Sequence, residues 1–425
     1  MADQPIDGMI AVERLDAWRA IEALRAGVPS RAAVLSLGVA SSDIEHRFRS
    51  QLTATQEAGN EAAGPSGFLI AGDFGAGKSH LLEYLRQVAL NERFVASKVV
   101  ISKEVPLYDP AKLYRAAIES AVAPGRRGSV LTHVAAQLDL NSRAYADLRL
   151  WAHSPMCGLN QRFAATLQLH QHIRDKDPEL IERLVGFWAG DRLQTAEIRA
   201  ALKECGEPLN YRFDPVDSLS LARQRFAFAA RLVLAAGYGG WVIDEIELVA
   251  RYSLRQRAKS YAEVARWLDN VRGEGYPGTL SVLAITADFE RAVLDDRDDR
   301  DLLPAKLRSS GREADQTLAG AADKGMKLIG RSVKLATPTR HAVDGTYERV
   351  RGLYATAYDW EPPPASSGEP LASTSMREYV RRWINEWDLR RLSPGYEPSI
   401  EAQPVSPGYT EDAEMEPPFE AGSAG

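Results

Sequence analysis

The chain has 425 residues, of which 45% are hydrophobic and 26% are charged, so it can build a large packed core and wholesale disorder is excluded. Its 52 Lys and Arg residues against 58 Asp and Glu residues give a formal net charge of −6, which argues against a protein coated with basic groups for nucleic acid. Two cysteines are too few for a disulfide scaffold and form no CxxC pair, which favours a reducing compartment.

The N-terminal sequence lacks the features of a secretion signal. Acidic residues stand within residues 1–18, where a signal peptide needs positive charge and then an apolar run. No stretch of about 18 uncharged apolar residues occurs along the chain. We therefore expect a soluble, cytoplasmic protein without a membrane segment.

The chain begins with a helical pattern. Large apolar residues between Ile10 and Leu24 recur on one stripe, and helix-breaking residues follow. A second helical stretch is predicted over residues 30–52, and a loop of small residues over 54–67. We interpret residues 1–66 as an N-terminal helical segment.

A glycine-rich motif follows residues 68–71, which have the apolar pattern of a buried strand. The motif reads GDFGAGKS, of the form GxxxxGK[ST], and the next residues carry the apolar period of a helix. In this context, backbone N–H groups and the helix N-terminus favour phosphate binding. We expect Lys78 to reach the β- and γ-phosphates of a nucleotide and the Ser79 hydroxyl to coordinate Mg²⁺. The predicted nucleotide-binding residues are Gly72, Asp73, Phe74, Gly75, Ala76, Gly77, Lys78, Ser79 and His80.

A second apolar strand, residues 241–243, is followed by two acidic residues. We expect Asp244 to hold Mg²⁺ at the carboxyl edge of the sheet, and Glu245 to be the base that orients the attacking water. A GTPase would need a guanine-reading Asn/Thr-Lys-x-Asp motif, which the sequence lacks. The predicted cofactors are therefore ATP and Mg²⁺.

Three further segments have the pattern of strands. Residues 280–285 are apolar and precede Thr286, a candidate sensor of the γ-phosphate; a Thr near the cap of a following helix is the alternative interpretation. Residues 99–102 and 331–336 are also strand-like. Together these segments predict an α/β fold with a parallel sheet and helices on both faces.

The glycine-rich motif and the Asp-Glu motif are far apart in the sequence. Lys78 and Asp244 are separated by 166 residues, about twice what two or three βα units need. Residues 121–219 lack strand-like alternation and contain helical stretches, so we predict a helical insertion there. His170 and His172 within it lie at i and i+2, which favours a solvated helix face over a metal site.

The order of these motifs resembles that of the AAA+ ATPases, and within them the origin-recognition and helicase-loader type. Three phrases look like those of the ATP-binding proteins (BrxD-like) of BREX phage-resistance systems: IEALRAGVPSRAAVLSLG, GDFGAGKSHLLEYL and WVIDEIEL. The resemblance covers roughly residues 10–390. It implies ATP binding and hydrolysis, oligomerisation or docking onto a partner helicase, and a part in antiphage defence.

The resemblance also implies a domain plan. An AAA+ P-loop ATPase core would cover residues 67–340, and a helical lid residues 341–391, with its last helix over 376–389. Residues 392–425 contain seven acidic residues and no Lys or Arg, and they show no apolar period. We interpret this acidic tail as disordered.

Arginines complete the sites of AAA+ proteins, usually from a neighbouring subunit. Arg308 and Arg312 are the candidates here, and the acidic run over residues 295–299 before them is interpreted as a solvated loop. A sensor arginine acting in cis would lie in the lid, where Arg377 flanks the apolar face of the last helix. The two Trp on that face are interpreted as core rather than as a platform for stacking bases.

A basic cluster follows the Asp-Glu strand. It consists of Arg251, Arg255, Arg257 and Lys259, with Tyr252 among them. Positive charge beside an aromatic ring suits a nucleic-acid backbone, so direct DNA contact is one hypothesis and a solvated charged face is the other.

The sequence thus predicts an AAA+ ATPase that loads, regulates or assembles a nucleic-acid-processing, helicase-containing defence complex. It would act as a homo-oligomer or with a helicase partner. The alternative is a nucleotide-gated switch or scaffold with slow hydrolysis and no direct nucleic-acid contact.

Overall fold

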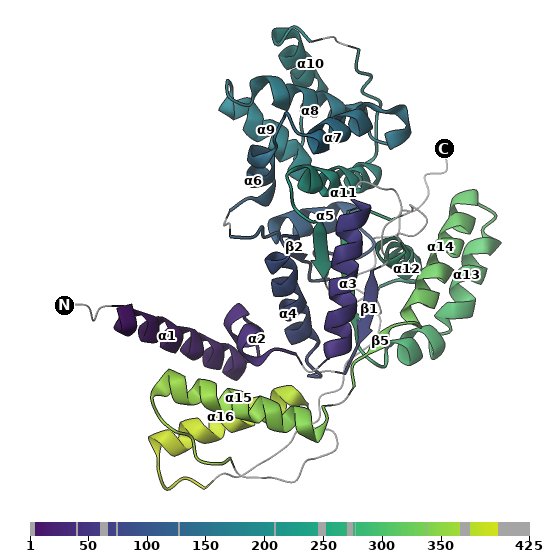
Figure 1. Ribbon diagram of the computed structural model, residues 1–425. Helices are drawn as coiled ribbons and strands as arrows, with labels where there is room; N and C mark the ends of the chain where they lie inside the picture. The colour runs from purple at the N-terminus through teal and green to yellow at the C-terminus, as the bar shows by residue number, and fades with distance from the viewer. Residues whose placement is uncertain are drawn as a thin grey trace.

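The computed structural model describes residues 5–39, 41–59, 67–73, 75–125, 128–207, 210–244, 252–269, 275–276, 278–336, 338–365 and 375–397. A parallel sheet of five strands lies at the centre of this part of the chain (Figure 1). The strand order is β2-β3-β4-β1-β5, and each pair of neighbours is parallel. The strands are β1 (Phe68–Ala71), β2 (Val95–Lys98), β3 (Trp241–Asp244), β4 (Thr279–Ile285) and β5 (Val333–Lys334). The predicted α/β fold with a parallel sheet is therefore confirmed.

One of the predicted strands was wrong. Residues 99–102 lie outside the sheet, and the strand is Val95–Lys98, four residues earlier. Val95 pairs with Trp241 and is fully buried, whereas Val100 is 56% exposed. Two adjacent apolar runs carry the same local signal, so the apolar pattern alone did not separate them.

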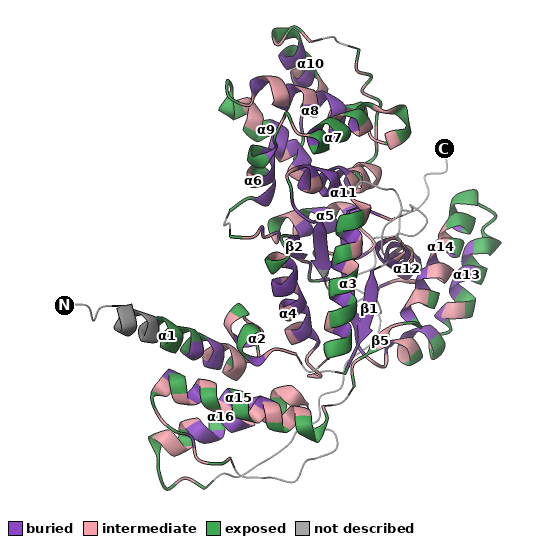
Figure 2. Cartoon of the chain, in the orientation of Figure 1, coloured by how far each residue is buried: buried purple, intermediate pink, exposed green. Residues whose placement is uncertain are grey.

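Helices cover both faces of the sheet, and alternate strand residues face the two layers. Phe68 and Ile70 of β1 pack with α3 (Ser42–Ala58) and α4 (Lys78–Asn91). Leu69 and Ala71 point to the opposite layer, which contains α11 (Ser218–Ala235), α12 (Leu254–Leu268) and α14 (Glu313–Ile329). β1 and β4 are buried along their whole length, as Figure 2 shows for β1, and this is typical of a parallel sheet covered on both sides. The edge strand β5 is not buried.

The N-terminal segment is divided more finely than predicted. It forms α1 (Pro5–Ala26) and α2 (Arg31–Leu37) before α3 begins. The single helix predicted over residues 30–52 is interrupted because Gly38 ends α2 with a φ of 62°, a left-handed backbone that favours glycine. Residues 54–58, predicted as loop, belong to α3.

The predicted insertion between β2 and β3 is helical. Its described helices, with those that flank it, are α5 (Pro110–Glu119), α6 (Val130–Gln137), α7 (Arg143–His153), the short η1 (Pro155–Cys157), α8 (Gln161–Ile173), α9 (Pro178–Ala189) and α10 (Thr195–Glu204), followed by α11. Figure 1 shows α6 to α10 gathered beyond α11, away from the end helices of the chain. The limits of the domains stay a prediction.

The prediction that the two histidines of the insertion lie on a solvated helix face was wrong for His170 and holds only in part for His172, which is half-buried. His170 is 1% exposed, and its ring lies 5.3 Å from that of Trp188. Burial lowers the pKa of His170 from its ordinary value of 6.5 to about 4, so the imidazole is neutral at pH 7. His172 lies 2.6 Å from a carboxylate oxygen of Glu207. The inward side of α8 is therefore a core surface.

The first and last described helices form one bundle. α1 packs with α15 (Arg340–Tyr358) and α16 (Met376–Leu392) around Ile21, Val380 and Trp387; we call these three helices the end bundle (Figure 1). Arg25 of α1 donates two hydrogen bonds of 2.9 Å to Asp388 of α16. Trp383 and Trp387 are buried in this core, which confirms their interpretation.

The last segment differs from the predicted tail at its beginning. Leu392, the first residue of that tail, is the last residue of α16. Residues 398–425 lie outside the described residues. Among the described helices, none combines the length and apolar composition needed to cross a bilayer.

The remaining helices lie beside the sheet. After β4 the chain forms a short π-helix, η3 (Glu290–Asp295), and then α13 (Asp299–Ser309) and α14. α14 crosses α12 so closely that a Cβ added to Gly325 would lie 1.8 Å from the carbonyl oxygen of Tyr261.

We predict that Gly325→Ala lowers the free energy of unfolding by about 1–3 kcal/mol, because the added methyl must push α12 and α14 apart. Gly320 in the same helix has no atom within 4 Å of an added Cβ. Gly320→Ala should therefore be neutral or should stabilise by up to about 1 kcal/mol through helix propensity. Urea unfolding of both variants tests this, and equal effects would contradict the close crossing.

Candidate functional site

The glycine-rich loop joins β1 to α4 at the carboxyl edge of the sheet. Gly75 and Gly77 have φ values of 82° and 94°, in the left-handed region that side chains rarely adopt. The N–H of Gly72 donates to the carbonyl of Ile285 at the end of β4, at 3.1 Å. The hydrogen bond fixes the loop to the sheet, and the two glycines let the chain turn towards the N-terminus of α4. Phe74 lies outside the described residues.

Lys78 is the first residue of α4, and it is only 7% exposed. Its ammonium donates to the carbonyl oxygens of Gly72 and Asp73, at 2.7 and 3.2 Å. The cation is therefore held beside the loop, where the positive end of the helix dipole also lies. This is an environment that favours an anion.

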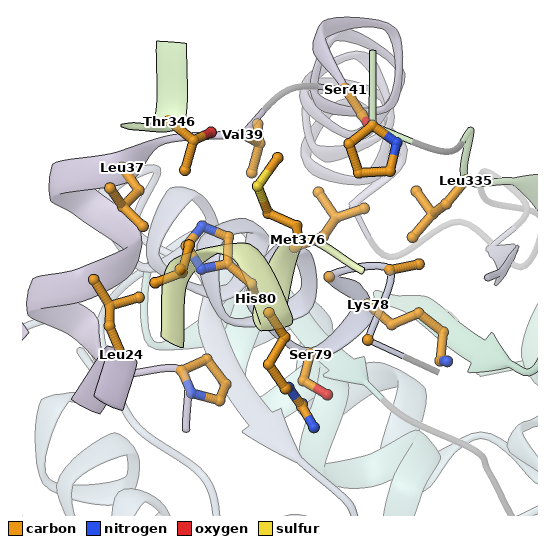
Figure 3. A pocket seen from close by; sticks show the side chains of 18 of the residues that line it. Leu24, Leu37, Val39, Ser41, Lys78, Ser79, His80, Leu335, Thr346 and Met376 are labelled. Carbon is orange, nitrogen blue, oxygen red and sulfur yellow. The ribbon is translucent and has the colours of Figure 1, made fainter. Parts of the chain in front are cut away.

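A cavity of about 290 Å³ opens beside the loop (Figure 3). Its lining combines the loop and the start of α4 with the α1–α2 segment and with α15 and α16. In Figure 3, Leu24 and Leu37 lie on the opposite side of the cavity from Lys78. The cavity thus has an apolar part and a cationic part, which suits a ligand with a flat apolar group at one end and an anion at the other.

Two arginines of the end bundle also line the cavity. The side chain of Arg377 in α16 starts near the loop, with its Cβ 4.0 Å from a Cβ position on Gly75, and its Cδ and Nε atoms lie 3.5 and 3.7 Å from a Cβ position on Gly27, after α1. Arg349 in α15 lies near the end of α2, with Nη1 3.9 Å from a Cβ position on Gly38. The sequence singled out Arg377 but not Arg349, since a basic residue on an amphipathic helix has the pattern of an ordinary surface position.

His80 connects two walls of the cavity. Its Nε2 atom lies 2.8 Å from the carbonyl oxygen of Gly38, so α4 is joined to the end of α2. Burial lowers the pKa of His80 below its ordinary value of 6.5. The neutral ring can donate this hydrogen bond while it faces the cavity beside Ser79.

The predicted acidic and sensor residues lie on the neighbouring strands. Asp244 is the last residue of β3, and its backbone pairs with Val282, at the same level as Phe68 of β1. Thr286 directly follows β4, which lies between β1 and β3, and it is buried. Thr286 is not in the lining of the cavity. Glu245 lies outside the described residues.

Arg308 and Arg312, the candidates for an arginine that a neighbouring subunit would supply, do not line the cavity of their own chain. Arg308 is in the last turn of α13 and is exposed, and Arg312 precedes α14 and lies 3.6 Å from Asp315. The solvated loop predicted before them was wrong for Asp299, which is 2% exposed and begins α13.

Of the described residues in the predicted DNA-binding cluster, Arg255 is exposed, and the others are buried or half-buried. Arg257 and Tyr252 are buried, and Arg257 makes an ion pair with Asp299. Arg255 pairs with Asp315 at 2.7 Å. Lys259 is half-buried, and Arg251 lies outside the described residues. The acidic partners of Arg255 and Arg257 come from α14 and α13, so the local sequence does not reveal these ion pairs.

Residues 12–137 match the family model of the BREX system ATP-binding protein BrxC/D. The matched region includes the glycine-rich loop, α4 and the α1–α2 wall of the cavity. The predicted resemblance to BREX ATP-binding proteins is confirmed over these residues. The comparison with curated proteins found no match.

The contact between the loop and α16 leads to a prediction. A Cβ on Gly75 would lie 2.6 Å from Oγ and 2.7 Å from Cβ of Ser375, the N-cap of α16, whereas a Cβ on Gly77 meets nothing within 4 Å. Both Ala variants bear the cost of a left-handed backbone, about 1–2 kcal/mol. We expect only Gly75→Ala to displace the start of α16. Amide hydrogen exchange over residues 375–380 should rise more in Gly75→Ala than in Gly77→Ala, and equal exchange would contradict the contact.

Proposed function

We propose that this chain binds and hydrolyses ATP with Mg²⁺, as a P-loop ATPase of the AAA+ type. In this proposal it loads, regulates or assembles a nucleic-acid-processing, helicase-containing complex of BREX antiphage defence. The observation that carries the proposal is the cavity at the end of β1, with the Lys78 ammonium on one side and apolar side chains on the other. The family match supports it, because the family is described as a BREX system ATP-binding protein.

The described residues fit a nucleoside triphosphate. The N–H groups at the start of α4, with Lys78 and Arg377, would meet the phosphates, and Leu24, Leu37 and Met376 would contact the base. Lys78 would exchange its two backbone carbonyl partners for phosphate oxygens, which are charged and so form stronger hydrogen bonds.

The metal and catalytic roles follow the motifs. Ser79, which lines the cavity, and Asp244 are the proposed Mg²⁺ ligands, and both offer the oxygen donors that this ion prefers. When bound, Mg²⁺ neutralises charge that develops on the β- and γ-phosphates. Glu245 would orient the attacking water, and Thr286, at the end of the strand between the two motifs, would contact the γ-phosphate.

The domain plan is part of the same proposal. Residues 67–340 would form the ATPase core with its insertion over about 121–219, and residues 341–391 the lid. Because α1 packs with α15 and α16, we include α1 in the body that moves as the lid. Arg308 or Arg312 of a neighbouring copy or a helicase partner would complete the site, since neither lines the cavity of its own chain.

A nucleotide-gated switch with slow hydrolysis and no direct nucleic-acid contact is a second candidate. The burial of Arg257 and Tyr252 favours it, because these residues are then withdrawn from a polyanion. Steady-state turnover, measured with and without duplex DNA, separates the two functions. Turnover of the order of 1 s⁻¹ or more, the lower end of typical enzymes, supports the ATPase.

We predict that Lys78→Ala abolishes ATP binding, whereas Glu245→Gln retains ATP and slows hydrolysis. The lysine interacts with phosphates already in the ground state, but a positioning base acts mainly in the transition state. Binding of a fluorescent ATP analogue and phosphate release should be measured for both variants. An equal loss of ATP affinity in the two variants would contradict these roles.

We also predict that specific ATPase activity falls on protein dilution, because the arginine is supplied in trans. An arginine of this kind can contribute about 10³-fold or more to the rate. Arg308→Ala or Arg312→Ala should remove the concentration dependence, and Arg143→Ala, an exposed position in α7, is the control. Activity that is independent of concentration and survives both substitutions would reject the arginine in trans.

A further inference from the structure

We propose that the buried ion pair between Arg257 and Asp299 positions residues 286–298, the segment that follows β4, for ATP hydrolysis. The two residues would act through Thr286 at the beginning of that segment, without touching the nucleotide themselves. This inference rests on the proposed function, because it assigns the pair a role in that reaction.

The pair is held in one geometry by several hydrogen bonds. Nε and Nη2 of Arg257 donate to the two carboxylate oxygens of Asp299, at 2.9 and 3.0 Å. The hydroxyl of Tyr261 donates to the same carboxylate at 2.7 Å, and Nη1 of Arg257 donates to the carbonyl of Tyr252 at 2.6 Å. Both charged groups are buried. A bidentate pair with these extra hydrogen bonds allows little freedom of orientation.

The ion pair connects α12 and α13, which follow two neighbouring strands. Arg257 lies in the first turn of α12, and the carbonyl that it holds belongs to Tyr252, the first described residue after β3. Asp299 begins α13 at the far end of the segment after β4. β3 and β4 are hydrogen-bonded neighbours whose ends carry Asp244 and Thr286. The pair therefore joins the start of α12 to the start of α13, two helices that follow the strands on which hydrolysis would depend.

The segment between β4 and Asp299 has backbone features that need such an anchor. It contains the π-helix Glu290–Asp295, and Asp298 has a φ of 55°. A π-helix is rare, and a left-handed backbone is uncommon at residues other than glycine, although Asp adopts it more often than most. Conformations of this kind persist when the surrounding contacts over-determine them. Asp298 directly precedes Asp299, so the ion pair supplies that restraint.

Stability alone is a weak reason for the pair. Removing two ions from water is costly, and well-packed apolar residues of similar volume often stabilise a core as well or better. What the pair adds is a single geometry, since Nε, Nη1 and Nη2 of a rigid guanidinium each donate to a fixed acceptor. We infer that it serves orientation of residues 286–298 more than overall stability.

The test compares Asp299→Asn with Glu263→Gln. Glu263 is also a buried carboxylate on α12, and it pairs with the partly exposed Arg223 at 2.6 Å. It lies near Tyr276, which precedes β4 at the opposite edge of the sheet. Both substitutions exchange a buried carboxylate for an amide of the same shape. Three quantities are measured: hydrogen exchange over residues 286–298, ATP affinity, and steady-state turnover.

For Asp299→Asn we expect faster exchange over residues 286–298 and a fall in turnover of about 10- to 100-fold, with ATP affinity unchanged, since a small misplacement costs this much. Glu263→Gln should leave all three quantities near those of the wild type. A similar loss of turnover in both variants, in proportion to their stability, would overturn the proposal.

A double variant tests whether the pair acts through Thr286. If it does, Asp299→Asn combined with Thr286→Ala should turn over no more slowly than Thr286→Ala alone, because the two changes remove one effect. Multiplicative losses would overturn the role of Thr286. If Asp299→Asn does not fold, Tyr261→Phe removes a single hydrogen bond from the carboxylate and should change exchange and turnover in the same direction, by a smaller factor.

Failure of this inference is distinguishable from failure of the proposed function. Wild-type protein that binds ATP without turnover would reject hydrolysis, whereas the exchange measurement still decides whether the pair holds residues 286–298. Unchanged exchange over this segment in Asp299→Asn would overturn the proposal whatever the turnover.

Discussion

The common direction of the described strands is the constraint on which the candidate site depends. Because β1, β3 and β4 are parallel, the segments that follow them all leave from one edge of the sheet. That edge is stepped: Ala71 of β1 pairs with Ile285, whereas Asp244 pairs with Val282, three residues earlier, a difference of about 10 Å along a strand. α4 begins directly after the loop, at this edge of the sheet.

The cavity adds a second constraint, since its walls come from both ends of the described chain. Leu24 and Val28 belong to the α1–α2 segment, and Met376 and Arg377 to α16. The hydrogen bonds of Arg25 with Asp388 join these ends into the end bundle, which meets the sheet domain at the loop. A ligand in the cavity touches both bodies at once. Its binding energy therefore depends on their relative position, and this dependence is what a nucleotide-driven change of conformation requires.

Local patterns predicted the parts of the site that are continuous in sequence. The loop between β1 and α4, the strand that ends at Asp244 and the apolar face of α16 could be predicted because glycine spacing and apolar period act within a few residues. Arg257 and Asp299 were misjudged for the opposite reason. Each is an ordinary charge in its own segment, and only the packing of α12 against α13 makes them partners. The position of β2 was missed because two apolar runs compete locally, and pairing with β3 decides between them.

The insertion shows how a long segment can be added without disturbing this edge. β2 and β3, which flank it, pair directly, so the chain leaves and returns at neighbouring strands, and closure of a longer loop adds little entropy. The inserted helices are attached through α11, where buried Arg225 donates to the carbonyls of Phe187 and Asp191, at 3.1 and 2.7 Å. No described residue of the insertion lines the cavity. Any influence of these described residues on the candidate site must therefore pass through the elements that they contact, among them α11 and α5, and not through direct contact with a ligand in the cavity.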